Sequence, residues 1–234
     1  MKITPPGLNF EIIVVDDGST DTTASIAKKF SNYYGHTKVI SYFPNKGKGF
    51  AVKTGVLAAE GNLILYNDAD GSAPIQELCK LEEQLLLGYD IALGSRNKDN
   101  NGSEVQFLLH RKIIGTLFNT LVKVFLVREF HDTQCGFKLF TKESAKNVFP
   151  LLTEQRFAFD IEVLFIAKHL GYKASEVGIN WSNVKGSKVN LILDSYRMFI
   201  SIFKVRVRRF KSKNTKVKQL NYENPNHLEM NNLL

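Results

Sequence analysis

Two pairs of carboxylates, each placed just after a run of apolar residues, constrain this chain more than any other feature. Residues 12–15 lead into Asp16-Asp17, and residues 63–66 lead, one residue later, into Asp68-Ala69-Asp70. Short apolar runs of this kind are typical of buried strands. In open α/β folds, ligands bind at the carboxyl ends of such strands. The two acidic strand ends together favour a nucleotide and metal site, because carboxylates with an open position suit Mg²⁺ or Mn²⁺ carrying phosphates.

Each acidic pair by itself also fits an ordinary strand-to-helix turn, in which Asp, Ser or Thr caps the next helix. The glycine-rich stretch 45–49 has a similarly plain interpretation. It lacks the spacing of a phosphate loop or of a dinucleotide fingerprint. It therefore fits a helix start whose small face, formed by Ala51, Gly55 and Ala58, packs closely on a sheet.

Apolar runs alternate with segments of helical spacing, and this alternation predicts an α/β fold with a doubly wound, mostly parallel sheet. We expect strands at 11–15, 38–43, 62–66, 90–93, 136–140 and 174–179. We expect helices at 20–34, 48–60, 74–87, 141–148 and 158–170, and a long apolar helix at about 105–127. The last is too short to cross a bilayer, since residues 113–127 span only about 22 Å at 1.5 Å per residue.

Composition narrows the class of protein. With 234 residues, 44% of them hydrophobic, and 17 Phe, the chain can bury the core of one domain of ordinary size. Its two cysteines, Cys79 and Cys135, form no C-x-x-C motif, so the sequence indicates neither a disulfide framework nor a zinc site. A reducing, cytosol-facing environment fits best.

The net charge of +8 is concentrated near the C-terminus. Residues 180–218 contain eleven Lys or Arg and one acid, a net of +10 that leaves −2 for the rest of the chain. Within this segment, residues 189–210 have an apolar side and a basic side, which predicts an amphipathic helix at an anionic membrane surface. A core-docked helix with a solvated face is the alternative. We therefore divide the chain into a catalytic domain (1–180), a membrane-interface segment (181–218) and a disordered tail (219–234).

Several motifs, in order along residues 10–210, resemble one known family. They are residues 14–21, 45–49, 68–71, 94–96, 132–140, 157–162 and 186–188. The family is that of the inverting glycosyltransferases that include the dolichyl-phosphate sugar synthases. The resemblance implies a nucleotide-diphospho-sugar transferase (GT-A-like) fold with a C-terminal amphipathic helix. Segments 132–138 and 186–188 most resemble the glucosyl branch, and residues 182–184 lack an arginine that the mannosyl branch carries there.

The resemblance also implies a role for each matching residue. On the donor side these are Asp17 at the nucleoside, Asp68 near the ribose or diphosphate, Lys48 at the nucleotide sugar, and Asp70 on a divalent metal, Mg²⁺ or Mn²⁺. Arg96 and Lys188 would bind phosphates of the donor or the acceptor. Arg111 is a further candidate for the acceptor phosphate, and Asp132 begins the acceptor-side motif. The implied catalytic set is Asp70, Asp132, Arg96 and Lys188.

The resemblance implies transfer of glucose from UDP-glucose to dolichyl phosphate at the cytosolic face of the endoplasmic reticulum membrane, with inversion to a β-linked product used in protein N-glycosylation. A phosphate acceptor is already anionic and needs no strong general base. Catalysis then consists of alignment and stabilisation of the departing diphosphate. We expect no nucleic-acid partner. The alternatives are mannosyl transfer from GDP-mannose and a catalytically inactive, membrane-associated binding module.

One departure from the family pattern concerns the N-terminus. Family members begin with a strand and a Pro-X-Tyr-Asn-Glu-like turn that forms part of the nucleotide pocket, whereas only residues 1–10 precede the first apolar run here. We therefore expect the first strand, its turn, the helix that follows and the membrane anchor of the glucosyl branch to be missing. This expectation makes the inactive module a genuine alternative.

Overall fold

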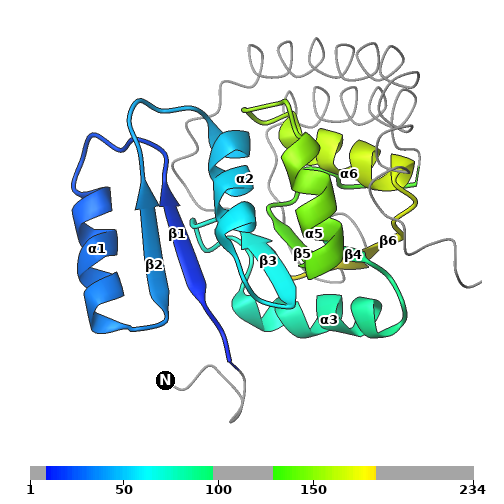
Figure 1. Cartoon of the computed structure of the whole chain (residues 1–234). Coiled ribbons are helices and arrows are strands. Elements are labelled where there is room, and N and C mark those ends of the chain that lie inside the picture. Colours follow the sequence, from blue (N-terminus) through cyan, green and yellow to red (C-terminus); the bar gives the residue numbers. More distant parts are fainter. Residues whose placement is uncertain (1–8, 97–128, 183–234) are drawn as a thin grey trace, which may run out of the picture.

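The computed structural model describes residues 9–96 and 129–182, in which short strands alternate with helices (Figure 1). The strands are β1 (Ile12–Asp16), β2 (Thr37–Ser41), β3 (Leu63–Asn67), β4 (Ile91–Ser95), β5 (Phe137–Thr141) and β6 (Ala174–Gly178). The helices are α1 (Thr23–Tyr33), α2 (Lys48–Ala58), α3 (Leu78–Leu86), α5 (Lys142–Val148) and α6 (Phe159–His169), with 3-10 turns η1 (Ile75–Glu77) and η2 (Phe149–Leu151). The predicted α/β class and the type of each of these elements are confirmed.

The described strands form two groups. β1 and β2 are a parallel pair, and the other four form a sheet in the order β3-β5-β4-β6. β4 and β6 are parallel, whereas β5 runs antiparallel to both of its neighbours. At the end of β3, the Asp68 amide donates to the Gly136 carbonyl over 2.9 Å. β5 thus begins at the edge where β3 ends. The sheet is mixed: three of its four strands run in one direction, as expected for a mostly parallel sheet, and β5 runs against them.

Helices cover both faces of the four-stranded sheet. On one face, α5 and α6 enclose a core that includes Phe140, Phe149 and Leu164. On the other face, α3 covers a core that includes Phe137 and Leu81. Side chains alternate along β5, since successive residues of a strand point to opposite faces. Because both faces are covered, even a charged residue in the middle of β5 is buried.

Helix α2 contacts both β1 and β3 and so joins the two groups of strands (Figure 1). Its packing is close, because a Cβ atom at Gly55 would lie 3.1 Å from Val15 Cγ2. The predicted packing of a small helix face on the sheet is therefore confirmed at Gly55. At its start, Gly47 has φ +101°, a conformation that glycine adopts without strain.

Three predicted segments lie outside the described residues: the apolar helix at 105–127, the amphipathic helix within 181–218, and the tail from 219 to 234. Among the residues that the structure describes, no helix has the length and apolar character needed to cross a bilayer.

Candidate functional site

Three motifs that are far apart in the sequence meet at one edge of the four-stranded sheet. β3 and β4 run in the same direction because each is antiparallel to β5, which lies between them. The residues that follow these strands, Asp68 and Arg96, therefore lie at the same edge. The segment leading into β5 meets both of them: Gly136 accepts the Asp68 amide, and the Asp132 carboxylate accepts the Arg96 amide over 3.0 Å.

Asp68 is held in a defined orientation by neighbours from three elements. Lys48 Nζ, from the first turn of α2, lies 2.8 Å from Asp68 Oδ1 and 3.0 Å from Oδ2. The Tyr66 hydroxyl donates to Oδ1 over 3.0 Å. Gly136 leaves the space for the carboxylate, since a Cβ atom there would lie 2.1 Å from Oδ2. Lys48 and Asp68 thus form one half of the candidate site, and the structure brings these two predicted residues into contact.

Asp17 shapes the loop that precedes α2. Its carboxylate accepts hydrogen bonds from the Asn45 side-chain amide and from the backbone amides of Lys46 and Gly47, each over 2.8 Å. The charge of this carboxylate is therefore used to organise the loop. The structure thus places Asp17 beside the start of α2.

Asp70 differs from the other acids at this edge because its side chain is exposed. One of its oxygens, Oδ1, accepts the Ser72 amide over 2.9 Å, which anchors the carboxylate. Among the described residues no group of three His, Cys, Asp or Glu side chains could enclose a metal ion. A lone anchored carboxylate nevertheless fits Mg²⁺ or Mn²⁺ bound together with a diphosphate, because such ions commonly take one or two carboxylates plus phosphate oxygens and water.

The other half of the site is an ion pair between Asp132, which is buried, and Arg96, whose side chain is 32% exposed. Arg96 Nε donates to Oδ2 over 2.7 Å, and Nη2 donates to Oδ1 over 2.8 Å. Burial alone would raise the pKa of Asp132, but the hydrogen bonds and charge of Arg96 outweigh it and hold that pKa below its usual value. The carboxylate therefore stays ionised. The guanidinium also lies over the Trp181 ring, 5.4 Å from its centroid.

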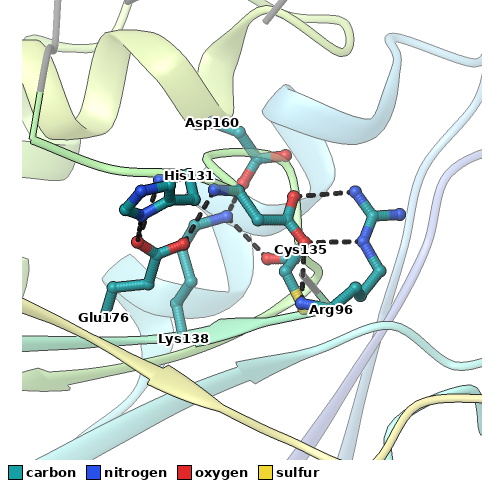
Figure 2. Close-up of polar contacts among 7 residues, drawn as sticks. Arg96, His131, Cys135, Lys138, Asp160 and Glu176 are labelled. Atoms are coloured by element: carbon teal, nitrogen blue, oxygen red, sulfur yellow. Dashed lines mark hydrogen bonds and ion pairs between the residues drawn. The ribbon is translucent and has the colours of Figure 1, made fainter. Parts of the chain in front are cut away.

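Glu176, in β6, supports the segment that carries Asp132. Its Oε1 accepts the Asp132 amide over 2.8 Å, and its Oε2 accepts the His131 amide over 2.9 Å. Burial would raise the pKa of Glu176, but these hydrogen bonds lower it below its usual value. Glu176 lies beside His131 in Figure 2, and in its ionised form it fixes the backbone of His131 and Asp132.

Beneath the edge lies a second ion pair, between Lys138 and Asp160, which is almost fully buried. Burial raises the pKa of Asp160 even though Lys138 opposes it. Burial likewise raises the pKa of the nearby Cys135 thiol to about 12. The thiol is therefore protonated at neutral pH, which argues against a cysteine nucleophile at this site.

The structure brings together Lys48 with Asp68 and Arg96 with Asp132, four of the predicted site residues. Two further predicted residues, Arg111 and Lys188, lie outside the described residues, and their roles stay predictions. The sequence did not single out Tyr66 or Glu176. A charged residue in the middle of the predicted strand 174–179 was the available signal for Glu176, because an acid in a covered strand needs a partner.

The chain belongs to a known family: the sequence pattern described as "Glycosyl transferase family 2" matches residues 2–149. Among curated proteins, the dolichyl-phosphate beta-glucosyltransferase of Drosophila melanogaster is 39% identical over 211 residues, covering 87% of this chain and 65% of the relative. The human protein of the same name is 40% identical over 192 residues, covering 79% and 59%. That of Saccharomyces cerevisiae is 33% identical over 218 residues, covering 86% and 65%. The chain thus spans at most 65% of the length of these relatives.

Solved structures support the same fold. Glucosyl-3-phosphoglycerate synthase from Mycobacterium tuberculosis, in complex with Mn²⁺, UDP and glucosyl-3-phosphoglycerate, is similar with a TM-score of 0.56 at 20% identity, covering 85% of this chain and 68% of that one. Mannosyl-3-phosphoglycerate synthase from Rubrobacter xylanophilus is similar with a TM-score of 0.51 at 20% identity, covering 86% and 64%. The predicted GT-A-like, nucleotide-diphospho-sugar transferase fold is confirmed.

Proposed function

We propose that this chain is the catalytic part of an inverting glucosyltransferase that moves glucose from UDP-glucose to dolichyl phosphate and forms a β-linked dolichyl glucosyl phosphate. The names of the curated relatives and the family membership support this activity. The donor side of the site would be formed by Asp17, Lys48, Asp68 and Asp70. The acceptor side would be formed by Arg96 and Asp132, with Arg111 and Lys188 as further phosphate ligands.

The observation that carries the proposal is the state of Asp132. A carboxylate that is bound by both arms of a guanidinium and has a lowered pKa is a poor general base. A hydroxyl acceptor would need such a base. An acceptor phosphate does not, because it is anionic at neutral pH. Arg96 would offer positive charge to that phosphate while Asp132 keeps the guanidinium in place.

The donor half is suited to a nucleoside diphosphate. Lys48 supplies a cation next to Asp68, and Asp17 holds the loop before α2 in a fixed shape. Asp70 would hold a divalent metal, Mg²⁺ or Mn²⁺, and the ion when bound would neutralise negative charge on the leaving diphosphate. These residues orient the donor and need no rearrangement of charge as the bond to the sugar breaks.

A donor panel tests the proposed reaction. The full chain is incubated with dolichyl phosphate and either UDP-glucose or GDP-mannose, with MnCl₂ or MgCl₂, and lipid-linked sugar is extracted and counted. We expect product from UDP-glucose and little from GDP-mannose. If product formed from GDP-mannose alone, the donor would be GDP-mannose and the assignment of UDP-glucose would be wrong. Binding of UDP without product from either donor would support the inactive binding module instead.

We further propose that residues 181–218 bring the site to an anionic membrane, at the cytosolic face of the endoplasmic reticulum. Their net charge of +10 supports this, since basic residues near an anionic surface contribute about 1 kcal/mol each. We expect the chain to sediment with anionic vesicles, to be released as salt is raised, and to lose this binding when residues 189–218 are removed. Equal binding to neutral vesicles, or preferential salt-sensitive binding to RNA, would contradict the proposal.

A substitution at Gly136 probes the donor half. A methyl group there would lie 2.2 Å from Asp68 Cγ, so the carboxylate must rotate away and lose its bond to Tyr66. A hydrogen bond to a charged group is worth about 1.5–3 kcal/mol, so we expect Gly136→Ala to weaken UDP binding by at least about tenfold. Calorimetric titration of UDP with MnCl₂ measures this. Gly35→Ala is the matched control, because its Cβ atom would meet nothing within 4 Å.

A further inference from the structure

The buried pair of Lys138 and Asp160 has no obvious role in stability. The side chains are 1% and 4% exposed, and they are in direct contact. Removing two charges from water costs several kcal/mol per ion, and an apolar pair of similar volume is often as stable or more stable. The pair is also too little exposed to bind a substrate directly. Its location directly below the donor half of the site therefore calls for a different explanation.

One path of contacts leads from this pair to Asp68 through side chains. Lys138 and Tyr66 face each other across β5 and β3. Lys138 Nζ lies 5.5 Å from the centroid of the Tyr66 ring, a distance at which an ammonium is attracted to the ring face. Phe159, the residue before Asp160, packs edge-on against the same ring at 5.8 Å. The ring is thus fixed within the core, and its hydroxyl is directed to Asp68 Oδ1.

A second path leads to Asp68 through the backbone. Lys138 Nζ donates to the Cys135 carbonyl over 2.7 Å (Figure 2). The next residue, Gly136, accepts the Asp68 amide and lies against its carboxylate. Lys138 is therefore connected to the Asp68 side chain through Tyr66, and to the Asp68 backbone through the Cys135–Gly136 peptide. An ammonium suits this task because one group donates to Asp160 and to a carbonyl while it also faces an aromatic ring.

We propose that Lys138, Asp160 and Tyr66 are positioning residues that fix the orientation of Asp68 from inside the core. The inference rests on the proposed function, because Asp68 is assigned there to the donor. In this arrangement, Asp160 keeps the ammonium of Lys138 in place. Lys138 in turn holds the Tyr66 ring and the Cys135–Gly136 peptide against Asp68. Preorganised geometry of this kind matters for turnover, since a displacement of about 1 Å can cost about 10²-fold in rate.

Two variants test the proposal. Lys138→Met combined with Asp160→Leu removes both charges and leaves no unpaired ion. We expect it to melt close to the wild type, yet to lose about 10²-fold in kcat with UDP-glucose and dolichyl phosphate. Tyr66→Phe removes only the hydroxyl. We expect it to bind UDP in MnCl₂ about tenfold more weakly, with a correspondingly raised donor KM and little change in melting temperature.

Matched controls separate positioning from general damage. Tyr172→Phe removes a hydroxyl that contacts Asn147, away from the site, and Lys168→Met with Glu129→Gln neutralises an exposed ion pair. Both should leave UDP affinity and kcat unchanged. If the wild type binds UDP while Tyr66→Phe and the double variant match it in UDP affinity, kcat and donor KM, the positioning role is overturned. If the double variant does not fold, Tyr66→Phe decides alone. A wild type that fails to bind UDP overturns the proposed function itself.

Discussion

Asp70→Asn is expected to lower turnover with UDP-glucose by about 10³-fold while leaving the melting temperature nearly unchanged. Of the acids at this edge, Asp70 is the one whose carboxylate is exposed and meets no cation among the described residues. Asp68 is paired with Lys48, and Asp132 with Arg96. The free charge of Asp70 is therefore the one available to a divalent ion. An amide binds such an ion more weakly, so charge on the leaving diphosphate would be poorly neutralised.

The measurement combines steady-state rates over a range of MnCl₂ concentrations with UDP titrations with and without EDTA. We expect wild-type UDP binding to weaken on chelation and Asp70→Asn binding to be weak in both conditions. Asp90→Asn is a matched control, because the Asp90 carboxylate also accepts a backbone amide, that of Lys173. Asp90 precedes β4 and so lies at the opposite edge of the sheet from the site, which follows the ends of β3 and β4. An Asp70→Asn protein that retains full activity in EDTA would remove Asp70 from the metal site.

The part of the site that the sequence could predict consists of residues at strand ends. Asp68 and Asp70 follow an apolar run, and in open α/β folds ligands bind at the ends of such strands, so both residues could be named as candidates from the sequence. The alternation of strands and helices was predictable for the same reason, since it depends on local pattern. Element boundaries differed by a few residues. The helix expected at 74–87, for example, is a 3-10 turn after Pro74 followed by α3.

The part that could not be predicted depends on which strands lie side by side. Tyr66 meets Lys138 only because β3 pairs with β5 in one register, and Glu176 reaches His131 and Asp132 only because β6 packs beside β4. Two strands that pair although about 70 residues separate them leave no local sequence pattern that reveals the pairing. Lys138 shows the same limit, because a lysine is ordinarily exposed, whereas α6 covers the face of β5 on which Lys138 and Phe140 lie. Residues that support the site from within the core are therefore harder to predict from the sequence than residues that line the site.

Asp132→Asn is expected to lower turnover by at least about 10²-fold, with donor binding largely kept. The amide cannot accept both arms of the Arg96 guanidinium as the carboxylate does, so the cation that would meet the acceptor phosphate loses its fixed orientation. UDP affinity should change little, because Asp68 and Lys48 keep their own contacts. Single-turnover rates at saturating UDP-glucose, with Asp90→Asn as the control, measure the loss. A rate within twofold of the wild type would show that the pair does not serve the acceptor.

The same variant should also change how stability depends on pH. The pKa of Asp132 is lowered in the folded chain, so the unfolded chain binds this proton more readily. The stabilisation by the ion pair is therefore complete above the unfolded pKa of about 3.9 and is lost as pH falls through the lower folded value. We expect the wild type to lose melting temperature more steeply than Asp132→Asn as pH is lowered below about 4. Parallel acid-melting curves for the two proteins would contradict an ionised, Arg96-bound Asp132. They would also remove the reason for proposing a phosphate acceptor, which is that an ionised, Arg96-bound Asp132 is a poor general base.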